Sequence, residues 1–222
     1  MDIHNMYNLE KQDDNGSYYI LLVIRKNKED PQQDVQANTE QAETLSGDLQ
    51  QNINKVLALT GNSSDINIRK FQGANGLPMT IVYINGLTDT EVINDNIMSP
   101  IMSDAEVNKA QQRTLSDFFT DMKDKILTVS ATNTISKIDE FMSALFSGDT
   151  VILAEGWEQG ISVSSSKWMQ RGVEEPSFQS VIRGPKDGFT EDMSTNIALV
   201  RRGIESPNLW KIESKNRTRN PN

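Results

Sequence analysis

Residues 66–84 read INIRKFQGANGLPMTIVYI, two extended segments joined by a turn that contains glycine and proline. In the first, Ile66–Phe71, successive side chains alternate in the way expected of a half-buried strand. The second, Met79–Ile84, is almost uninterruptedly apolar, which is typical of a strand buried on both faces. Gly73–Pro78 supplies the turn chemistry between them. We therefore predict two strands here and work outward from them.

Helices are predicted on both sides of these strands. Before them, apolar residues recur at helical spacing and stop at Gly61-Asn62, a typical helix end: Leu45, Leu49, Ile53, Val56 and Leu57. After them, Thr88-Asp-Thr-Glu91 has the spacing of a capping box and predicts a helix that runs to Pro100. The pattern around the strands is therefore strand–helix alternation.

Two further helices and an edge strand are expected before residue 148. A second capping box, Ser103-Asp-Ala-Glu106, predicts a helix through about Lys125. Residues 126–134 indicate a short edge strand. An amphipathic helix then ends at Gly148, with its apolar positions at Ile135, Ile138, Phe141, Met142 and Leu145.

The sequence pattern changes after Gly148, where short strand candidates follow one another. Val151–Ala154 and Gly160–Ser164 flank EGWEQG and predict a hairpin. Further strands are expected at Gln179–Arg183 and Leu209–Ile212, on either side of a helix at about Glu191–Gly203. We place a domain boundary near Ser147–Thr150.

The predicted fold is α/β, of the mixed α+β type, with two small subdomains, each a mixed β-sheet flanked by helices. The first subdomain covers 44–148 and the second 149–222. Residues 1–43 form a polar N-terminal segment and linker. Within it, 1–16 are expected to be disordered or accessory. Tyr18–Arg25 is a short apolar strand without an evident partner.

Composition excludes several functional classes. A net charge of −9 and a pI near 4.7 argue against a nucleic-acid partner. The chain has no cysteine, and its single histidine, His4, lies in a polar stretch, so neither a metal site nor a catalytic triad is supported. The start lacks the features of a signal peptide and no apolar run reaches the length of a membrane span, so we expect a soluble chain that is not exported.

The glycine-containing stretch Arg183–Asp192, RGPKDGFTED, has two interpretations. A phosphate loop would place backbone N–H groups at a helix N-terminus. The spacing fits neither the Walker A nor the dinucleotide pattern, and Glu191 and Asp192 already complement the helix start. We favour a rigid joint, beside a basic surface close to Glu174 and Glu175: Arg183, Lys186, Arg201 and Arg202.

The segment GVEEPSFQSVIRGPKDGFTEDMSTNIALVRRGIESPNL resembles the signature region of the A subunits of bacterial spore germinant receptors, the GerA family. GNSSDINIRKF, IVYINGLTDTEVIND and SGDTVILAEG resemble the family upstream, in the same order. Lys167 and Gly203 depart from the usual pattern. The positions that match the signature, which we take as candidate interface residues, are Trp168, Glu174, Glu175, Pro176, Arg183, Gly184, Pro185, Gly188, Phe189, Glu191, Asn196, Arg201 and Arg202.

The resemblance implies a two-part α/β N-terminal domain on the cytosolic side of the spore inner membrane. It would act with B and C subunits, and with its own membrane domain, to turn nutrient binding into ion release. Family members continue into a further strand–helix unit and membrane spans, so the second subdomain is expected to be incomplete. The resemblance carries over no catalytic residue, cofactor or metal, and we expect no enzyme.

Two alternatives stay open. The domain is a nutrient-binding unit with a small molecule in the cleft between its halves, lined by Trp157 and Trp168. Or it is an inert remnant whose second sheet has an unpaired edge. The sequence names neither the nutrient nor the oligomeric state.

Overall fold

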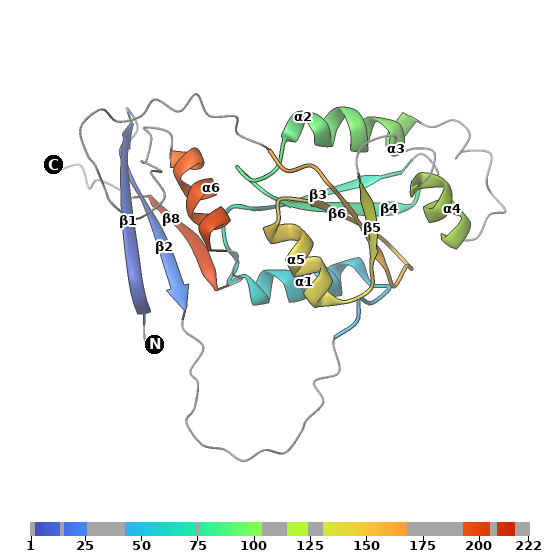
Figure 1. Cartoon of the computed structure of the whole chain (residues 1–222), viewed down its shortest axis with the longest axis horizontal. Helices are drawn as coiled ribbons and strands as arrows, with labels where there is room; N and C mark the ends of the chain where they lie inside the picture. Colours follow the sequence, from blue (N-terminus) through green and yellow to red (C-terminus); the bar gives the residue numbers. More distant parts are fainter. Residues whose placement is uncertain are drawn as a thin grey trace, which may run out of the picture.

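The computed structural model describes residues 3–13, 16–25, 43–73, 76–103, 115–123, 131–167, 193–204 and 208–215. Its strands form two sheets with helices packed against them, one of five strands and one of three (Figure 1). The predicted class of mixed helices and strands is confirmed. Every strand pairing in the described part is antiparallel, in place of the mixed pairing expected, and three of these six pairs join consecutive strands as hairpins.

The five-stranded sheet has the order β3-β4-β6-β7-β5. Its strands are β3 (Ile66–Gln72), β4 (Pro78–Ile84), β5 (Thr132–Ile135), β6 (Thr150–Ala154) and β7 (Gly160–Val163). The quoted stretch forms the β3–β4 pair, in which Ile66 is opposite Ile84 and Gln72 is opposite Pro78. The predicted hairpin after Gly148 is β6–β7, and the predicted edge strand is β5.

Helices cover both faces of this sheet, which explains the composition of β4. Met79, Ile81 and Tyr83 belong to one apolar cluster, whereas Val82 and Ile84 belong to another. Alternate residues of a strand point to opposite faces, so a strand buried on both faces must be apolar throughout. The second cluster includes side chains of α1 (Leu49–Leu59) and α5 (Ile138–Phe146), which lie together below the sheet in Figure 1.

The opposite face is covered by a helix that changes its hydrogen-bonding pattern. It begins as α2 (Thr90–Val92), continues as the π-helix η1 (Ile93–Met98) and ends as α3 (Ser99–Ser103), and α4 (Leu115–Asp121) packs on the same cluster. The prediction that Pro100 ends this helix is wrong. Pro100 is the second residue after the π-helix, whose cap Ser99 still donates to Asn94 O, so the ordinary i→i−4 ladder is already interrupted there and the missing N–H of Pro100 costs less.

Aspartates cap the helices on either side of the β3–β4 pair, and for the second helix the predicted cap was one position earlier. α1 begins after Asp48, whose Oδ1 accepts from Gln51 N at 2.9 Å. α2 begins after Asp89, which accepts from Glu91 N. Thr88, predicted as the cap, is buried and its hydroxyl donates to Gly148 O at 3.1 Å. Thr88 therefore makes a buried hydrogen bond to Gly148, which is distant in the sequence, and not the local capping bond that the spacing suggested.

The three-stranded sheet has the order β1-β2-β8, with β1 at Ile3–Asp13, β2 at Gly16–Arg25 and β8 at Leu209–Lys215. β2 therefore finds its partner at the other end of the described chain, where Leu21 is opposite Ile212. Of the two expectations for residues 1–16, disorder is wrong for 3–13, which form a strand, whereas an accessory role stays a prediction. Their backbone completes the ladder on the outer side of β2, which does not require apolar side chains.

The two sheets divide the sequence differently from the boundary predicted near 148. β6 follows that point and pairs with β4, which precedes it, so strands on both sides of 148 share one sheet. The separate sheet is formed by the N-terminal hairpin together with β8. Sequence order alone did not reveal this, because the hairpin and β8 are far apart along the chain.

Candidate functional site at the junction of the two sheets

The helix α6 (Met193–Gly203) lies between the three-stranded and the five-stranded sheets (Figure 1). It buries Asn196, Ile197, Ala198 and Arg201, and Ala198 joins the apolar cluster below the five-stranded sheet. The turn after β4 closely approaches this helix. A β-carbon at Gly86, which has φ +88°, would lie 3.2 Å from Ser194 O. The part of the signature segment that α6 contains therefore lies at the contact between the two sheets.

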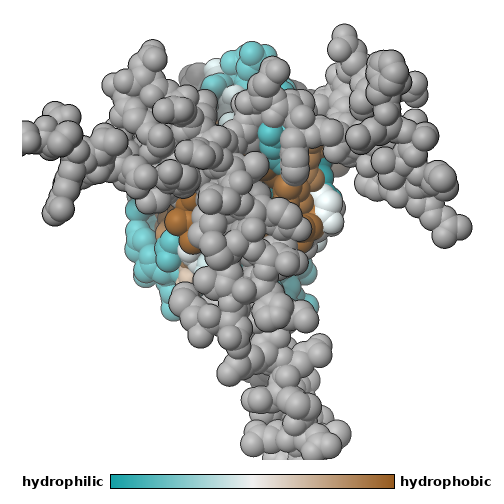
Figure 2. All heavy atoms as spheres, turned by 90° about the vertical axis from the view of Figure 1, so that its left-hand side faces the viewer, coloured by the Kyte–Doolittle hydropathy of each residue, from teal (hydrophilic) through white to brown (hydrophobic). Residues whose placement is uncertain are grey.

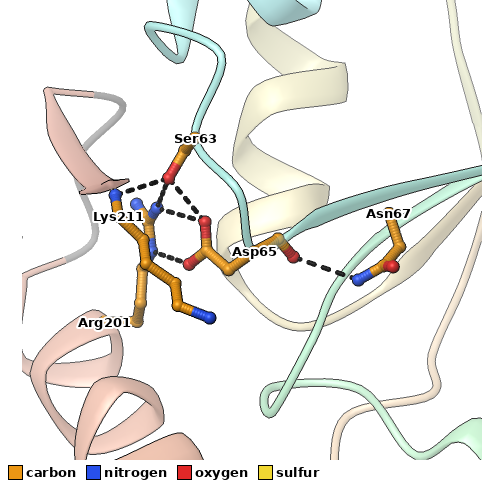
Figure 3. A network of polar contacts seen from close by, with 5 residues as sticks. All are labelled: Ser63, Asp65, Asn67, Arg201 and Lys211. Atoms are coloured by element: carbon orange, nitrogen blue, oxygen red, sulfur yellow. Dashed lines mark hydrogen bonds and ion pairs between the residues drawn. The ribbon is translucent and has the colours of Figure 1, made fainter. Parts of the chain in front are cut away.

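The central interaction of the junction is a buried ion pair between Arg201 and Asp65 (Figure 3). Arg201 Nε donates to Asp65 Oδ2 at 2.8 Å, and Nη2 donates to Oδ1 at 2.9 Å. The side chains are 1% and 2% exposed, respectively. This parallel two-point geometry is the strong form of an arginine–carboxylate contact. It fixes the C-terminal turn of α6 to the loop that precedes β3.

Ser63 connects β8 to the same pair (Figure 3). Its hydroxyl donates to Asp65 Oδ1 at 2.6 Å and accepts from Arg201 Nη2 at 2.9 Å and from Lys211 N at 2.7 Å. In addition, Ser64 N donates to Lys211 O at 3.0 Å. The loop before β3, the helix α6 and the strand β8 therefore share one buried hydrogen-bond network.

One nitrogen of Arg201 has no acceptor within this network. Nη1 is buried and, among the residues that the structure describes, has no hydrogen-bond partner. The guanidinium carbon lies 5.4 Å from the centre of the Phe146 ring, which places the cation near an aromatic face. The guanidinium of Arg201 is therefore hydrogen-bonded to Asp65 and Ser63 and also lies near the ring of Phe146.

Trp210 of β8 forms a second contact between the three-stranded sheet and the rest of the domain, next to the polar network. A β-carbon placed on Gly61 would lie 2.2 Å from Trp210 Cε2, so the indole lies directly against the glycine backbone. Gly61 also has φ +59°, a conformation that other residues rarely adopt. The Gly61-Asn62 helix end predicted from the sequence thus has a packing role as well.

Only three of the predicted site residues lie within the described part of the chain. Asn196 is buried in α6. Arg202 is exposed and donates from Nη2 to Lys167 O. The following predicted residues lie outside the described residues: Trp168, Glu174, Glu175, Pro176, Arg183, Gly184, Pro185, Lys186, Gly188, Phe189 and Glu191.

The prediction that Arg201 belongs to a basic surface is wrong. The side chain is 1% exposed and its charge is paired internally with Asp65. Sequence reasoning missed Ser63, Asp65 and Lys211 as its partners. The available signal was GNSSDINIRKF, a segment with family resemblance in which a carboxylate directly precedes an apolar strand.

The predicted cleft tryptophan also has a structural role. Trp157 stacks on Phe119 with ring centres 3.3 Å apart and planes at 11°, and it packs against the apolar cluster above the sheet. One face of the Trp157 ring is thus occupied by Phe119, and its predicted place in a ligand cleft stays a prediction. Trp168 lies outside the described residues.

Two of the pockets lined by described residues differ in size and position. The smaller, about 160 Å³, lies beside α6 and is lined by Asn85, Gly86, Thr88, Thr90, Lys167, Ser194 and Thr195. The larger, about 550 Å³, is a shallow depression between β5 and α5, and Asp149 contributes to its lining. Burial raises the pKa of the Asp149 carboxyl, while a hydrogen bond from Ser164 acts in the opposite direction. The described residues contain no group of three or more side chains suited to hold a metal ion.

Comparison with known proteins identifies the family. The sequence model of the Bacillus/Clostridium GerA spore germination proteins matches residues 52–220. The chain belongs to the GerA family. Residues of both the five-stranded sheet and the junction lie within the matched range, whereas β1 and β2 precede it.

GerA-family relatives cover most of this chain. Spore germination protein KA of Bacillus subtilis is 30% identical over 81% of the chain, and spore germination protein B1 of the same organism is 30% identical over 74%. The aligned region is 32% and 33% of these relatives, respectively, so the chain spans about a third of their length. No helix in the described part combines the length and apolarity needed to cross a membrane.

A solved structure supports the same family. The N-terminal domain of the A subunit of the Bacillus megaterium spore germinant receptor GerK3 matches with a TM-score of 0.59 and 31% identity. The match covers 77% of this chain and 60% of that chain.

Proposed function

We propose that this GerA-family chain is the N-terminal domain of a spore germinant receptor A subunit and acts in germinant sensing and signal transduction. The observation that carries the proposal is its similarity to the GerK3 A-subunit domain, at 31% identity over 77% of the chain. In the proposed arrangement the domain lies on the cytosolic side of the spore inner membrane. Its partners are the B and C subunits and its own membrane domain.

The junction suggests how such a domain transmits a signal. α6 is fixed to the loop before β3 by Arg201 and Asp65, and that loop is fixed to β8 by Ser63. A displacement of the three-stranded sheet is therefore passed to the five-stranded sheet through rigid contacts. In this mechanism the domain biases its membrane-embedded partners by movement or docking and performs no chemistry of its own.

The test uses spores that carry the full-length receptor subunit as their only nutrient receptor of this kind. Arg202→Glu reverses an exposed charge at the end of α6, and we expect it to slow nutrient-triggered germination, measured as the fall in optical density of the spore suspension. Lys70→Glu is the matched control, because Lys70 is also exposed but lies on β3. Normal germination of spores with either variant would show that the exposed surface of α6 takes no part in the proposed mechanism.

The pocket beside α6 favours nutrient binding as a second candidate function. It adjoins the junction and its lining is polar, with four hydroxyl side chains, one amide and one lysine: Thr88, Thr90, Ser194, Thr195, Asn85 and Lys167. Such a lining suits a small polar nutrient. Melting curves with amino acids, sugars and nucleosides test this, with Thr90→Val as the variant expected to remove any shift. A flat response across all three classes of nutrient argues against it.

The remnant interpretation receives less support from this arrangement. It requires an unpaired edge in the second sheet. β8 is an edge strand, but it pairs with β2 over residues 209–215 and its Lys211 backbone also bonds to Ser63 and Ser64. We infer that the described chain forms one cooperative unit, and a single unfolding transition by two optical probes is the expected result.

A further inference from the structure

The β1–β2 hairpin is joined to the rest of the fold through one strand. Among the described elements, β2 makes its extensive contacts with β1 and β8 alone. The ladder to β8 pairs Tyr18 with Lys215 at one end and Ile24 with Leu209 at the other. The hairpin also lies outside the range matched by the GerA family model, which begins at residue 52 and includes β8. The hairpin therefore precedes the matched region and pairs with a strand, β8, that lies within it.

The opposite side of β8 is held by the body of the domain. Lys211 donates from its backbone N to Ser63 Oγ and accepts at its carbonyl from Ser64 N. These bonds hold β8 in place independently of the hairpin. If β2 were absent, the edge of β8 that now pairs with β2 would present its backbone donors and acceptors to another strand. An open edge of this kind is a template for strand addition. Figure 2 views the molecule from the left-hand side of Figure 1, where this sheet is drawn, and the atoms coloured in that view include both brown apolar and teal hydrophilic ones.

We propose that the hairpin is a strand donor that can pair with β8 of a second copy of this chain, so that two chains exchange hairpins. The occupant is specified by the observed ladder, since the second copy's β2 makes the same pairing as the chain's own. Residues 26–42 connect the hairpin to the first described residue of the body, Glu43. A segment of that length reaches up to about 55 Å when extended, enough to pass from one domain to another. Exchange of an identical element is a low-cost route to a dimer because it needs no new interface.

The absence of cysteine makes the exchange directly measurable. One chain carries Leu21→Cys and a second, with a tag of different size, carries Ile212→Cys; the two are unfolded, mixed, refolded together and oxidised. Leu21 and Ile212 are opposite each other in the ladder. Opposed residues of antiparallel strands lie at about 4.5–5.5 Å between Cα atoms, within the range that a disulfide bridges. A mixed disulfide then requires the hairpin of one chain on β8 of the other.

The matched control replaces Ile212→Cys by Ser214→Cys, because Ser214 is opposite Tyr19 and out of register with Leu21. We expect roughly tenfold more mixed disulfide from the register-matched pair than from the control. Equal yields from the two pairs would overturn the proposal. A chain carrying both Leu21→Cys and Ile212→Cys completes the test: cross-linked monomer alone, at every protein concentration, also overturns it, as does failure to form any cross-link.

A second measurement uses the tether. Deleting residues 30–38 leaves the hairpin and β8 intact but shortens the connection to the body. A shorter connection disfavours pairing within one chain, so the dimer fraction in light scattering should rise in the shortened chain. A dimer fraction that stays at zero in both the shortened and the full chain would contradict the exchange.

Discussion

Arg201 and Asp65, which are 136 positions apart in the sequence, form an ion pair in which both side chains are almost completely buried. The pair joins the only described helix of the family signature to the loop before β3. Two adjacent arginines in the same motif thus have different environments, since Arg202 is exposed. Conclusions about the signature must therefore treat the two residues separately.

Removing Arg201 should destabilise the domain far more than removing Arg202. Arg201→Met leaves the Asp65 carboxylate buried without its partner, and we expect a loss of about 3–5 kcal/mol in the free energy of unfolding. Arg202→Met, at an exposed position, should change it by no more than about 0.5 kcal/mol. Urea denaturation of the two variants measures both. Similar losses would mean that Arg201 is not paired in solution.

Ser63→Ala tests the link between α6 and β8. The change removes the acceptor of Lys211 N and one acceptor of Arg201 Nη2. A buried donor left without a partner costs about 1–3 kcal/mol; the Lys211 bond is only partly buried and Arg201 Nη2 keeps Asp65, so we expect a loss of about 1 kcal/mol. Hydrogen exchange should show faster exchange at the Lys211 amide in particular. An unchanged exchange rate there would show that the amide has another acceptor.

Gly61→Ala should be more destabilising than Gly76→Ala, although both glycines have positive φ. At Gly61 the new methyl group meets the Trp210 ring, whereas at Gly76 it has no atom within 4 Å. We expect losses of about 2–5 kcal/mol at Gly61 and about 1–2 kcal/mol at Gly76. Thermal unfolding compares them, and a shift in Trp fluorescence in the Gly61 variant would report the displaced indole. Equal losses of stability in the two variants would mean that strain at positive φ accounts for the whole effect and that contact with Trp210 adds nothing.

Asp149→Asn should stabilise the domain at neutral pH. Burial raises the pKa of the carboxyl in the folded state, so the folded protein binds a proton more readily than the unfolded chain. Its ionised form therefore reduces stability above that raised pKa, and the reduction disappears as pH falls below the unfolded value of 3.8. The amide removes this dependence and its oxygen still accepts from Ser164. Because the carboxyl is only half-buried and solvent screens its charge, we expect a gain well below about 1 kcal/mol at pH 7 and none below pH 3.8, measured by urea denaturation at the two pH values.

The sequence predicted local elements well and their partners poorly. The helix before Gly61, the strands at 66–71 and 79–84 and the hairpin after Gly148 follow from apolar spacing and turn residues, which act over a few positions. The pairing of β2 with β8 depends on residues at opposite ends of the described chain, which no local period encodes. That is why Tyr18–Arg25 showed a strand without a partner.

The candidate site was the least predictable part, for a physical reason. Charged side chains are normally solvated, so Arg201 was interpreted as a surface residue. Its burial depends on a carboxylate and a hydroxyl from the loop at 63–65, brought there by the five-stranded sheet. Most of the remaining signature residues lie outside the described part of the chain, so their grouping stays a prediction.

The position of β2 in the sheet has a consequence for synthesis of the protein. Translation makes β2 before the whole five-stranded sheet, and β8 only after it. During translation the apolar run YYILLVI is therefore without its hydrogen-bonding partner β8 until the rest of the chain has been made. An apolar strand in that condition is prone to associate with neighbouring chains. The polar strand β1, formed next to it and translated first, can pair with it at once and cover one of its edges during that interval.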